Sequence, residues 1–402
     1  MTEKQLEIKL GQLLNSLSYA LDISENRYFG HSRRTAYIAF TIARNMDLPE
    51  EDIIDIYYAS LIHDIGMAGD LSRYSIAEIH YDDTLKKEHC AFGYQILDRL
   101  PLRDSIKQYI LYHHEEWDGN GPYSLKGDEI PLGSQIIHIA DHFELFFVRK
   151  AEIGMEKKDI DIIYKWLDNH RNTTFNTHIC HQLLDVIARE KFWLDLKSEN
   201  IHQALKLIEP GKNTYINIFD LHKISEAFSM LIDAKSRFTY EHSRGVSNIT
   251  SNFTTYLGYN PLMIEKLTIA ANLHDIGKFI VPSTILEKPG KLTKEEFSLI
   301  KSHVYYTKLI LKQIEGIEDI AEWAGNHHEK LNGKGYPERL DDKSLTKEDQ
   351  VIAFADIFQA LTEDRPYRKG LAPNKAIDIM MDMAEKGYID KGMLSDFKQV
   401  VL

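Results

Sequence analysis

The sequence predicts an all-α protein built from two tandem copies of one helical domain. Apolar residues recur at helical spacing along most of the chain, and strand-like stretches are few. Several polar motifs of the first half reappear in the second half in the same order. The chain has 402 residues, which is more than a single hydrophobic core usually supports. We therefore expect two helical domains.

Helical periodicity marks successive segments of the first half, each with apolar residues on one side. The third segment follows Pro49 and opens with acidic residues, as helix N-termini often do, and Gly66 and Gly69 break it. The predicted helices are 4–21, 31–46, 51–65, 85–98, 103–114, 134–149, 156–168 and 175–192, with a loop at 117–133 and short extended pieces around 279–281 and 215–218.

The internal repeat has an offset of 211 to 215 residues. The paired stretches are YALDISENRYFGHS (19–32) with MLIDAKSRFTYEHS (230–243), SLIHDIGM (60–67) with ANLHDIGK (271–278), YHHEEWDGNG (112–121) with NHHEKLNGKG (326–335), and IAD (139–141) with FAD (354–356). From this alignment we place one domain at 1–195, a linker at 196–212 and the second domain at 213–402.

Each copy carries five histidines and two aspartates in one order. Neighbouring helix residues point about 100° apart, so His274 and Asp275 can share an ion only with partners from other helices. Imidazoles and carboxylates suit two closely spaced divalent transition-metal ions with an aspartate between them. The candidate ligands are His242, His274, Asp275, His303, His327, His328 and Asp356 in the second copy, and His31, His63, Asp64, His89, His113, His114 and Asp141 in the first.

The other histidines have no counterpart in the opposite copy, so we expect surface or core roles for them. They are His80, His138, His142, His170, His178, His181, His202 and His222.

Composition narrows the class of protein. A net charge of −13 argues against a protein that binds nucleic-acid polymers. Two widely separated cysteines, Cys90 and Cys180, form no disulfide framework and fit a reducing cytoplasm. The opening MTEKQLEIKL lacks the apolar centre of a signal peptide, and no uncharged run has the roughly 20 residues of a membrane span. We expect a cytoplasmic protein without a membrane partner, and the sequence indicates no oligomeric state.

The second copy resembles the HD-GYP phosphodiesterases, a branch of the HD metal-dependent phosphohydrolases. The matching motifs are DAKSRFTYEHS (233–243), HDIGK (274–278), HHEKLNGKGYP (327–337) and FADIFQALTEDRPYR (354–368). The resemblance implies an all-α core, a di- or trinuclear metal site and hydrolysis of cyclic dinucleotides, chiefly cyclic di-GMP. Some members with duplicated domains prefer the mixed cyclic GMP-AMP.

The resemblance also implies roles for individual residues. One metal would be held by His242, His274, Asp275 and Asp356, and the other by Asp275, His303, His327 and His328. Lys278 would contact the scissile phosphate, Arg365 would hold a phosphate or a guanine edge, and Gly335, Tyr336 and Pro337 would shape the substrate pocket. Trinuclear members have a further carboxylate four residues before the first histidine. Phe238 stands there, so we expect two divalent ions, Fe or Mn.

The first copy keeps the metal ligands but departs from the substrate motifs. Met67 replaces Lys278, and Asn120-Gly121-Pro122-Tyr123 replaces the Lys-Gly-Tyr-Pro of the second copy. Lys150 occupies the position of Arg365. We expect a degenerate HD domain with its own metal site that hydrolyses the substrate poorly and supports or regulates the second copy.

The sequence thus predicts a cyclic di-GMP phosphodiesterase in which a metal-bridging hydroxide attacks phosphorus and Asp275 and Lys278 are catalytic. A phosphodiesterase for 3′3′-cyclic GMP-AMP is one alternative. A hydrolase of other phosphoesters is a second, although the GYP loop and Arg365 argue against it. A di-iron protein that senses oxygen or redox state is a third.

Overall fold

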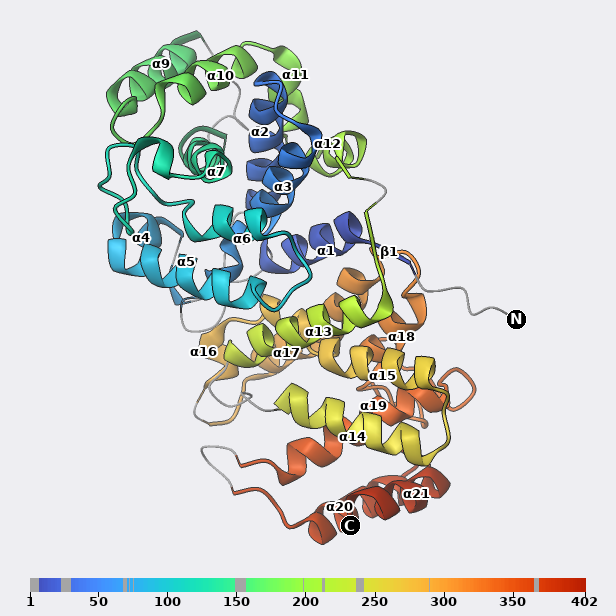
Figure 1. Cartoon of the computed structure of the whole chain (residues 1–402). Helices are drawn as coiled ribbons and strands as arrows, with labels where there is room; N and C mark the ends of the chain where they lie inside the picture. The colour runs from blue at the N-terminus through green and yellow to red at the C-terminus, as the bar shows by residue number, and fades with distance from the viewer. Residues whose placement is uncertain are drawn as a thin grey trace. The chain divides into compact units, whose positions relative to one another are not determined.

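The computed structural model describes most of the chain: residues 7–22, 30–67, 71, 73–74, 76–148, 157–197, 199–211, 214–235, 242–288, 290–364 and 369–402. Helices dominate these residues, which confirms the all-α prediction (Figure 1). They form two compact units. The N-terminal unit comprises Leu13–Met67 and Leu71–Thr214, and the described part of the C-terminal unit comprises 7–12 and 215–402. None of the described helices is both long enough and apolar enough to cross a membrane.

The N-terminal unit carries helices drawn from blue to green in Figure 1. They are α1 (Leu10–Asp22), α2 (His31–Asn45), α3 (Glu50–Leu61), the 3-10 turn η1 (His63–Met67), α4 (Ile76–Tyr81), α5 (Asp83–Leu97), α6 (Asp104–Leu111), the 3-10 turn η3 (Gly127–Glu129), α7 (Leu132–Phe143), the π-helical turn η4 (Glu144–Val148), α9 (Lys157–His170), α10 (Thr177–Ile187), α11 (Glu190–Asp195) and α12 (Ile201–Ile208).

The C-terminal unit repeats this order of helices, drawn from yellow-green to red. They are α13 (Ile218–Ala234), α14 (His242–Tyr256), α15 (Pro261–Leu273), the 3-10 turn η5 (Ile276–Ile280), α16 (Ser283–Leu286), α17 (Lys294–Leu311), α18 (Glu318–Asn326), α19 (Lys347–Thr362), α20 (Pro373–Glu385) and α21 (Lys391–Val401). The short strands β1 (Ile8–Lys9) and β2 (Tyr215–Ile216) pair antiparallel, as expected near 215–218.

Equivalent helices pack in equivalent ways, which confirms the repeat. In the N-terminal unit α2 packs on α3 and α7, and α5 packs on η1 and α6. In the C-terminal unit α14 packs on α15 and α19, and α17 packs on η5 and α18. Each unit therefore brings six equivalent helices and turns together in the same pairs.

Aromatic packing fixes two of the helices that carry candidate ligands. Phe253 of α14 packs edge-to-face on Phe397 of α21 with ring centroids 4.9 Å apart, and Phe354 of α19 joins them. All three rings are fully buried. Burying such a side chain stabilises the fold by about 1.5–3 kcal/mol, so this cluster holds α14 and α19 at a fixed spacing.

Three local expectations differ from the structure. The first helix begins at Leu10, because Ile8 and Lys9 pair with β2. The helix expected at 51–65 ends at Leu61, and the HDIG residues form the 3-10 turn η1. The extended piece expected at 279–281 was wrong at its start, since η5 runs to Ile280.

The segment proposed as a linker, 196–212, contains α12, which packs on α2. Its apolar side chains Ile201, Ala204 and Leu205 are buried, so the N-terminal unit extends to Thr214. The proposed domain boundaries at 195 and 213 therefore differ from the limits of the compact units.

Candidate metal centres

The C-terminal unit gathers its seven candidate ligands from helix ends, from the interiors of α17 and α19, and from the turn before η5. His242 opens α14, His274 follows α15, Asp275 precedes η5, and Asp356 lies in α19. His303 comes from α17, and His327 and His328 follow α18. The donor atoms form two neighbouring groups, His242–His274–Asp356 and His303–His327–His328.

A buried aspartate fixes the start of α14. Asp233 accepts hydrogen bonds from the backbone N of Ser243 (3.2 Å) and from its hydroxyl (2.8 Å). In the N-terminal unit Asp22 accepts from the backbone N of Ser32 (3.0 Å) in the same way. Capping of this kind satisfies amide groups that a helix leaves free, so it sets where the first candidate histidine lies.

The His-Asp turn is held directly against α17. The Thr307 hydroxyl donates to the carbonyl of His274 (2.9 Å) and accepts from the amide of Gly277 (3.0 Å). A Cβ at Gly277 would lie 1.9 Å from the carbonyl oxygen of His303, so only glycine permits this approach. The glycine of HDIG therefore brings the His-Asp pair to the helix that carries His303, the next candidate ligand.

The tautomers of three histidines fit a bound cation. Nδ1 of His274, His303 and His327 lies 2.6–2.7 Å from a backbone carbonyl three residues earlier. A carbonyl only accepts, so each Nδ1 carries the hydrogen and Nε2 presents a lone pair.

The Nε2 atoms of His303 and His327 are 3.3 Å apart. Burial lowers the pKa of both rings, that of His303 to about 3, so both are neutral. Two facing lone pairs at this distance repel each other unless a cation lies beside them, and the residues therefore fit a metal ion.

Asp275 stands between the two groups. Its Oδ1 lies 3.2 Å from Nε2 of His303, and its Oδ2 lies 3.1 Å from Nε2 of His274 and 2.5 Å from Nζ of Lys278. Burial raises the pKa of this carboxyl, but His274 and Lys278 outweigh that effect and lower it well below its usual value. An ionised carboxylate with one oxygen toward each group is suited to bridge two ions.

Asp356 and Glu363 hold the two sides of His242. Nε2 of His242 lies 3.2 Å from Oδ1 of Asp356, and Nδ1 lies 3.0 Å from Oε2 of Glu363. Burial lowers the pKa of His242, but the two carboxylates raise it overall, to about 10. A carboxylate behind a ligating histidine fixes its orientation and increases its basicity.

The GYP loop lies beside His328. The ring of Tyr336 packs on the ring of His328 at 4.9 Å, and its amide donates to the His328 carbonyl at 3.3 Å. Glu329 shapes the loop by accepting hydrogen bonds from the amides of Glu338 (2.7 Å), Arg339 (3.0 Å) and Leu340 (3.0 Å). His328 is 31% exposed, so this side of the site faces the loop and solvent.

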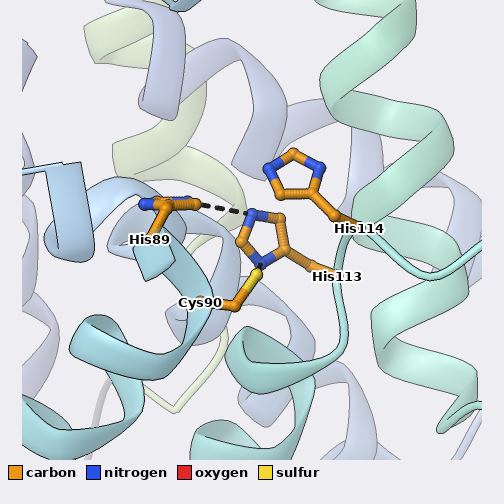
Figure 2. A group of neighbouring side chains, drawn as sticks. All are labelled: His89, Cys90, His113 and His114. Atoms are coloured by element: carbon orange, nitrogen blue, oxygen red, sulfur yellow. Dashed lines mark hydrogen bonds between the residues drawn. The ribbon is translucent and has the colours of Figure 1, made fainter. Parts of the chain in front are cut away.

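The N-terminal unit gathers its seven candidate ligands in the same arrangement. Nε2 of His31 lies 3.2 Å from Oδ1 of Asp141 and 3.6 Å from Oδ2 of Asp64. Oδ1 of Asp64 lies 3.7 Å from Nε2 of His63 and 3.6 Å from Nε2 of His89. Figure 2 shows His89 and His113 meeting through their Nε2 atoms, which are 3.3 Å apart.

Cys90 lies next to this group but on the far side of the His113 ring. Its Sγ is 3.7 Å from Nδ1 of His113, and that nitrogen already donates to the Ile110 carbonyl at 2.7 Å. Figure 2 places Cys90 and His114 on opposite sides of His113. Burial raises the pKa of the Cys90 thiol, so it stays protonated, and we do not count it as a ligand.

The position equivalent to Lys278 has apolar surroundings in the N-terminal unit. Met67, which replaces Lys278, is buried in a cluster with Ile79, against which Tyr74, Leu85 and Leu145 pack. The methionine side chain carries no positive charge, unlike the lysine at the equivalent position of the C-terminal unit.

Several sequence-predicted positions lie outside the described residues, namely Arg365, Lys150 and Phe238. Other residues of the sites were missed. Glu115 and Glu329 both shape the loop after the paired histidines, and their recurrence in HHE was a signal for this role. Glu144 contacts Nδ1 of His31, and Glu363 contacts Nδ1 of His242. The two glutamates do not align in the repeat, so the repeat gave no signal for them.

Comparisons with known proteins agree with this geometry. A profile of the HD domain family matches residues 15–159 and 226–393. The chain is 28% identical over 389 residues to 3′3′-cGAMP-specific phosphodiesterase 1 of Vibrio cholerae, covering 95% of this chain and 90% of that protein. It is 30% identical over 194 residues to a cyclic di-GMP phosphodiesterase of Thermotoga maritima, covering 47% of this chain and 53% of that protein.

A solved structure also matches along the whole chain. It is that of V-cGAP3, a cyclic GMP-AMP-specific phosphodiesterase of V. cholerae, with a TM-score of 0.70 and 25% identity, covering 98% of both chains.

Proposed function

Because the chain belongs to the HD domain family, we propose that its C-terminal unit is a metal-dependent phosphodiesterase that hydrolyses a cyclic dinucleotide. In this proposal the catalytic domain is 213–402, and the degenerate domain at 1–195 supports or regulates it. The observation that carries the proposal is the ion pair of Lys278 with Asp275 inside a complete set of seven ligands. The N-terminal unit has the ligands but an apolar cluster around Met67 in place of the lysine.

The proposed cofactors are two divalent ions, Fe or Mn, in the C-terminal unit, with a further metal site in the N-terminal unit. His242, His274, Asp275 and Asp356 would hold one ion, and Asp275, His303, His327 and His328 the other. When bound, such ions lower the pKa of a bridging water and neutralise charge on phosphoryl oxygens.

The protein's own side chains would complete the site. Lys278 already reaches Asp275, so a small rotation brings its ammonium toward a phosphate oxygen beside that carboxylate. Positive groups aimed at developing oxyanion charge are usually the largest contribution to such catalysis. Glu363 keeps His242 oriented, and Glu329 keeps the loop that carries Gly335, Tyr336 and Pro337 against His328. The ring of Tyr336 offers a surface on which a base could stack.

We propose 3′3′-cyclic GMP-AMP as the first substrate to test. The relatives that match along both units carry this specificity in their names, and the cyclic di-GMP phosphodiesterase of T. maritima matches less than half of the chain. Cyclic di-GMP, the substrate expected from the sequence motifs, remains the second candidate.

The test is product analysis of the full chain loaded with Mn²⁺ or Fe²⁺ and supplied with each cyclic dinucleotide separately. We expect linear products, with the mixed dinucleotide turned over faster. His274→Ala/Asp275→Ala should abolish turnover, and the matched variant His63→Ala/Asp64→Ala should retain it. If the first pair keeps full turnover, or neither dinucleotide is cleaved, the proposal is wrong.

A further inference from the structure

The N-terminal unit contains a cluster of histidines that the repeat does not account for. His80 of α4 and His142 of α7 lie beside Asp141, and one donor atom from each of the three lies within 4.8 Å of the others. The rings of His80 and His142 are 4.8 Å apart, and His138 packs on His142 at 4.5 Å. The sequence by itself predicts only surface or core roles for these three histidines.

Asp141 faces two separate sets of nitrogen atoms with its two oxygens. Oδ1 lies 3.2 Å from Nε2 of His31, in the set that the repeat predicts. Oδ2 lies 3.1 Å from Nε2 of His80, in the additional cluster. A carboxylate with partners on both oxygens in this way is arranged to bridge two cation sites.

The nitrogen atoms of the cluster are suited to bind a cation. Nδ1 of His142 lies 3.1 Å from the carbonyl of His138, so Nδ1 donates and Nε2 keeps its lone pair. His114 packs edge-to-face on His80 with centroids 4.8 Å apart. Within the described part of the chain, neither ring nitrogen of His114 has a hydrogen-bond partner, although the side chain is buried. His114 already belongs to the set that the repeat predicts, so its buried ring marks where that set and the additional cluster meet.

We infer that His80, His142 and Oδ2 of Asp141 form a further binding site for a divalent transition-metal ion in the N-terminal unit, with His114 beside its open position. Two imidazoles and one carboxylate suit Zn²⁺ or Fe²⁺. In a tetrahedral site with bonds of about 2.1 Å, donor atoms lie about 3.4 Å apart. The distance from His80 to Asp141 is 3.1 Å, and the other donor separations in the cluster are at most 4.8 Å.

The C-terminal unit lacks this site. By the alignment of Asp141 with Asp356, Ile357 stands in place of His142 and Ala353 in place of His138. The region equivalent to His80, around 291–294, contains no histidine. The site is therefore a property of the N-terminal unit alone.

Packing alone is the competing explanation. His138 and His142 also contact the ring of Phe175, at 5.2 and 5.6 Å, so the histidines could serve as an aromatic wall. Packing requires the ring shapes but no ion, and an ion count separates the two explanations.

The experiment counts Zn²⁺ in the full chain after metal removal, reloading and dialysis, by elemental analysis. The variant His80→Ala/His142→Ile should hold one Zn²⁺ fewer per chain than the parent protein. Isoleucine is the residue that the second copy carries at this position of the same helix, which favours folding. His178→Ala/His181→Ala removes two exposed histidines of the same unit and should leave the count unchanged.

A second measurement does not depend on any variant folding. Crystals of the parent protein loaded with Zn²⁺ should give an anomalous-scattering peak between His80, His142 and Asp141. Equal Zn²⁺ counts in the variant and the parent, or no peak at this position, would overturn the inference. Turnover of cyclic dinucleotides takes no part in either readout, so failure of the proposed function would leave both results interpretable.

Discussion

The Nδ1 atom of His242 lies 3.0 Å from the carboxylate of Glu363, seven residues after Asp356 in the chain. In the N-terminal unit the corresponding histidine, His31, is held by Glu144, only three residues after Asp141. In each copy a glutamate holds the equivalent histidine. Relative to the aspartate, the two glutamates stand at positions about one helical turn apart. The same interaction has been kept while the residue that supplies it has changed.

Glu363→Gln should weaken metal binding by the C-terminal unit. The amide keeps the shape of the side chain but removes the charge that orients His242 and raises its pKa. Changes of this kind typically cost about 10–100-fold in metal affinity or activity. Titration of metal-free protein with Mn²⁺ measures the effect. A matched variant, Gln359→Glu/Glu363→Gln, puts the carboxylate where Glu144 stands and should recover part of the affinity. An unchanged Mn²⁺ affinity in Glu363→Gln would contradict the role of this carboxylate.

Lys278→Met should separate catalysis from metal binding. Methionine is the residue of the N-terminal unit at this position, so the fold accommodates it. Loss of a positive group aimed at the phosphoryl oxygens should lower kcat by about 10²–10³-fold while the metal content stays the same. Turnover and elemental analysis of one preparation give both quantities. If the variant instead lost metal in proportion to its loss of activity, Lys278 would act by positioning Asp275.

The assembly of each set of candidate ligands could be predicted because the set recurs in the two copies. A single buried histidine is common in protein cores. The same histidines and aspartates in the same order in a second copy made metal binding the simplest explanation. Each unit brings its set together. The Nε2 contact of His303 with His327 is matched by that of His89 with His113, both at 3.3 Å.

Residues that act from non-equivalent positions could not be predicted in this way. Glu144 and Glu363 do not align, and His80, His138 and His142 have no partner in the other copy. Phenylalanine and isoleucine favour strands, so the prediction of an extended piece at Phe279 and Ile280 was wrong. The close contact of Gly277 with α17 keeps them in a 3-10 turn, and that contact depends on residues some 30 positions away in the chain.

Metal binding to the metal-free protein should release protons near neutral pH. In that state Asp356 and Glu363 overcome the effect of burial and raise the pKa of His242 to about 10, and Glu144 and Asp141 do the same for His31. Both rings are therefore charged at pH 7–9 and must lose a proton to bind an ion. The apparent affinity should rise with pH, by up to about tenfold per pH unit for each ring.

Calorimetric titration in buffers of different ionisation enthalpy measures the released protons. The stability of the metal-free protein depends on pH in the opposite direction to its metal affinity. Since the pKa of His242 is raised from 6.5 to about 10, its contribution is complete below pH 6.5 and is lost as pH rises toward 10. An affinity that does not change between pH 7 and 9 would contradict the assignment of His242 and His31 as ligands that are protonated before metal binds.

Gly277→Ala and Gly66→Ala should damage the two units separately. The new Cβ would lie 1.9 Å from the His303 carbonyl oxygen in one case and 2.0 Å from the His89 carbonyl oxygen in the other. Either helix must move away from its His-Asp turn, which we expect to cost about 1–3 kcal/mol and to separate the ligands. Thermal unfolding and ion counts should change in both variants, but turnover should fall only in Gly277→Ala. Equal loss of turnover in Gly66→Ala would mean that the N-terminal metal centre is required for catalysis rather than a separate support.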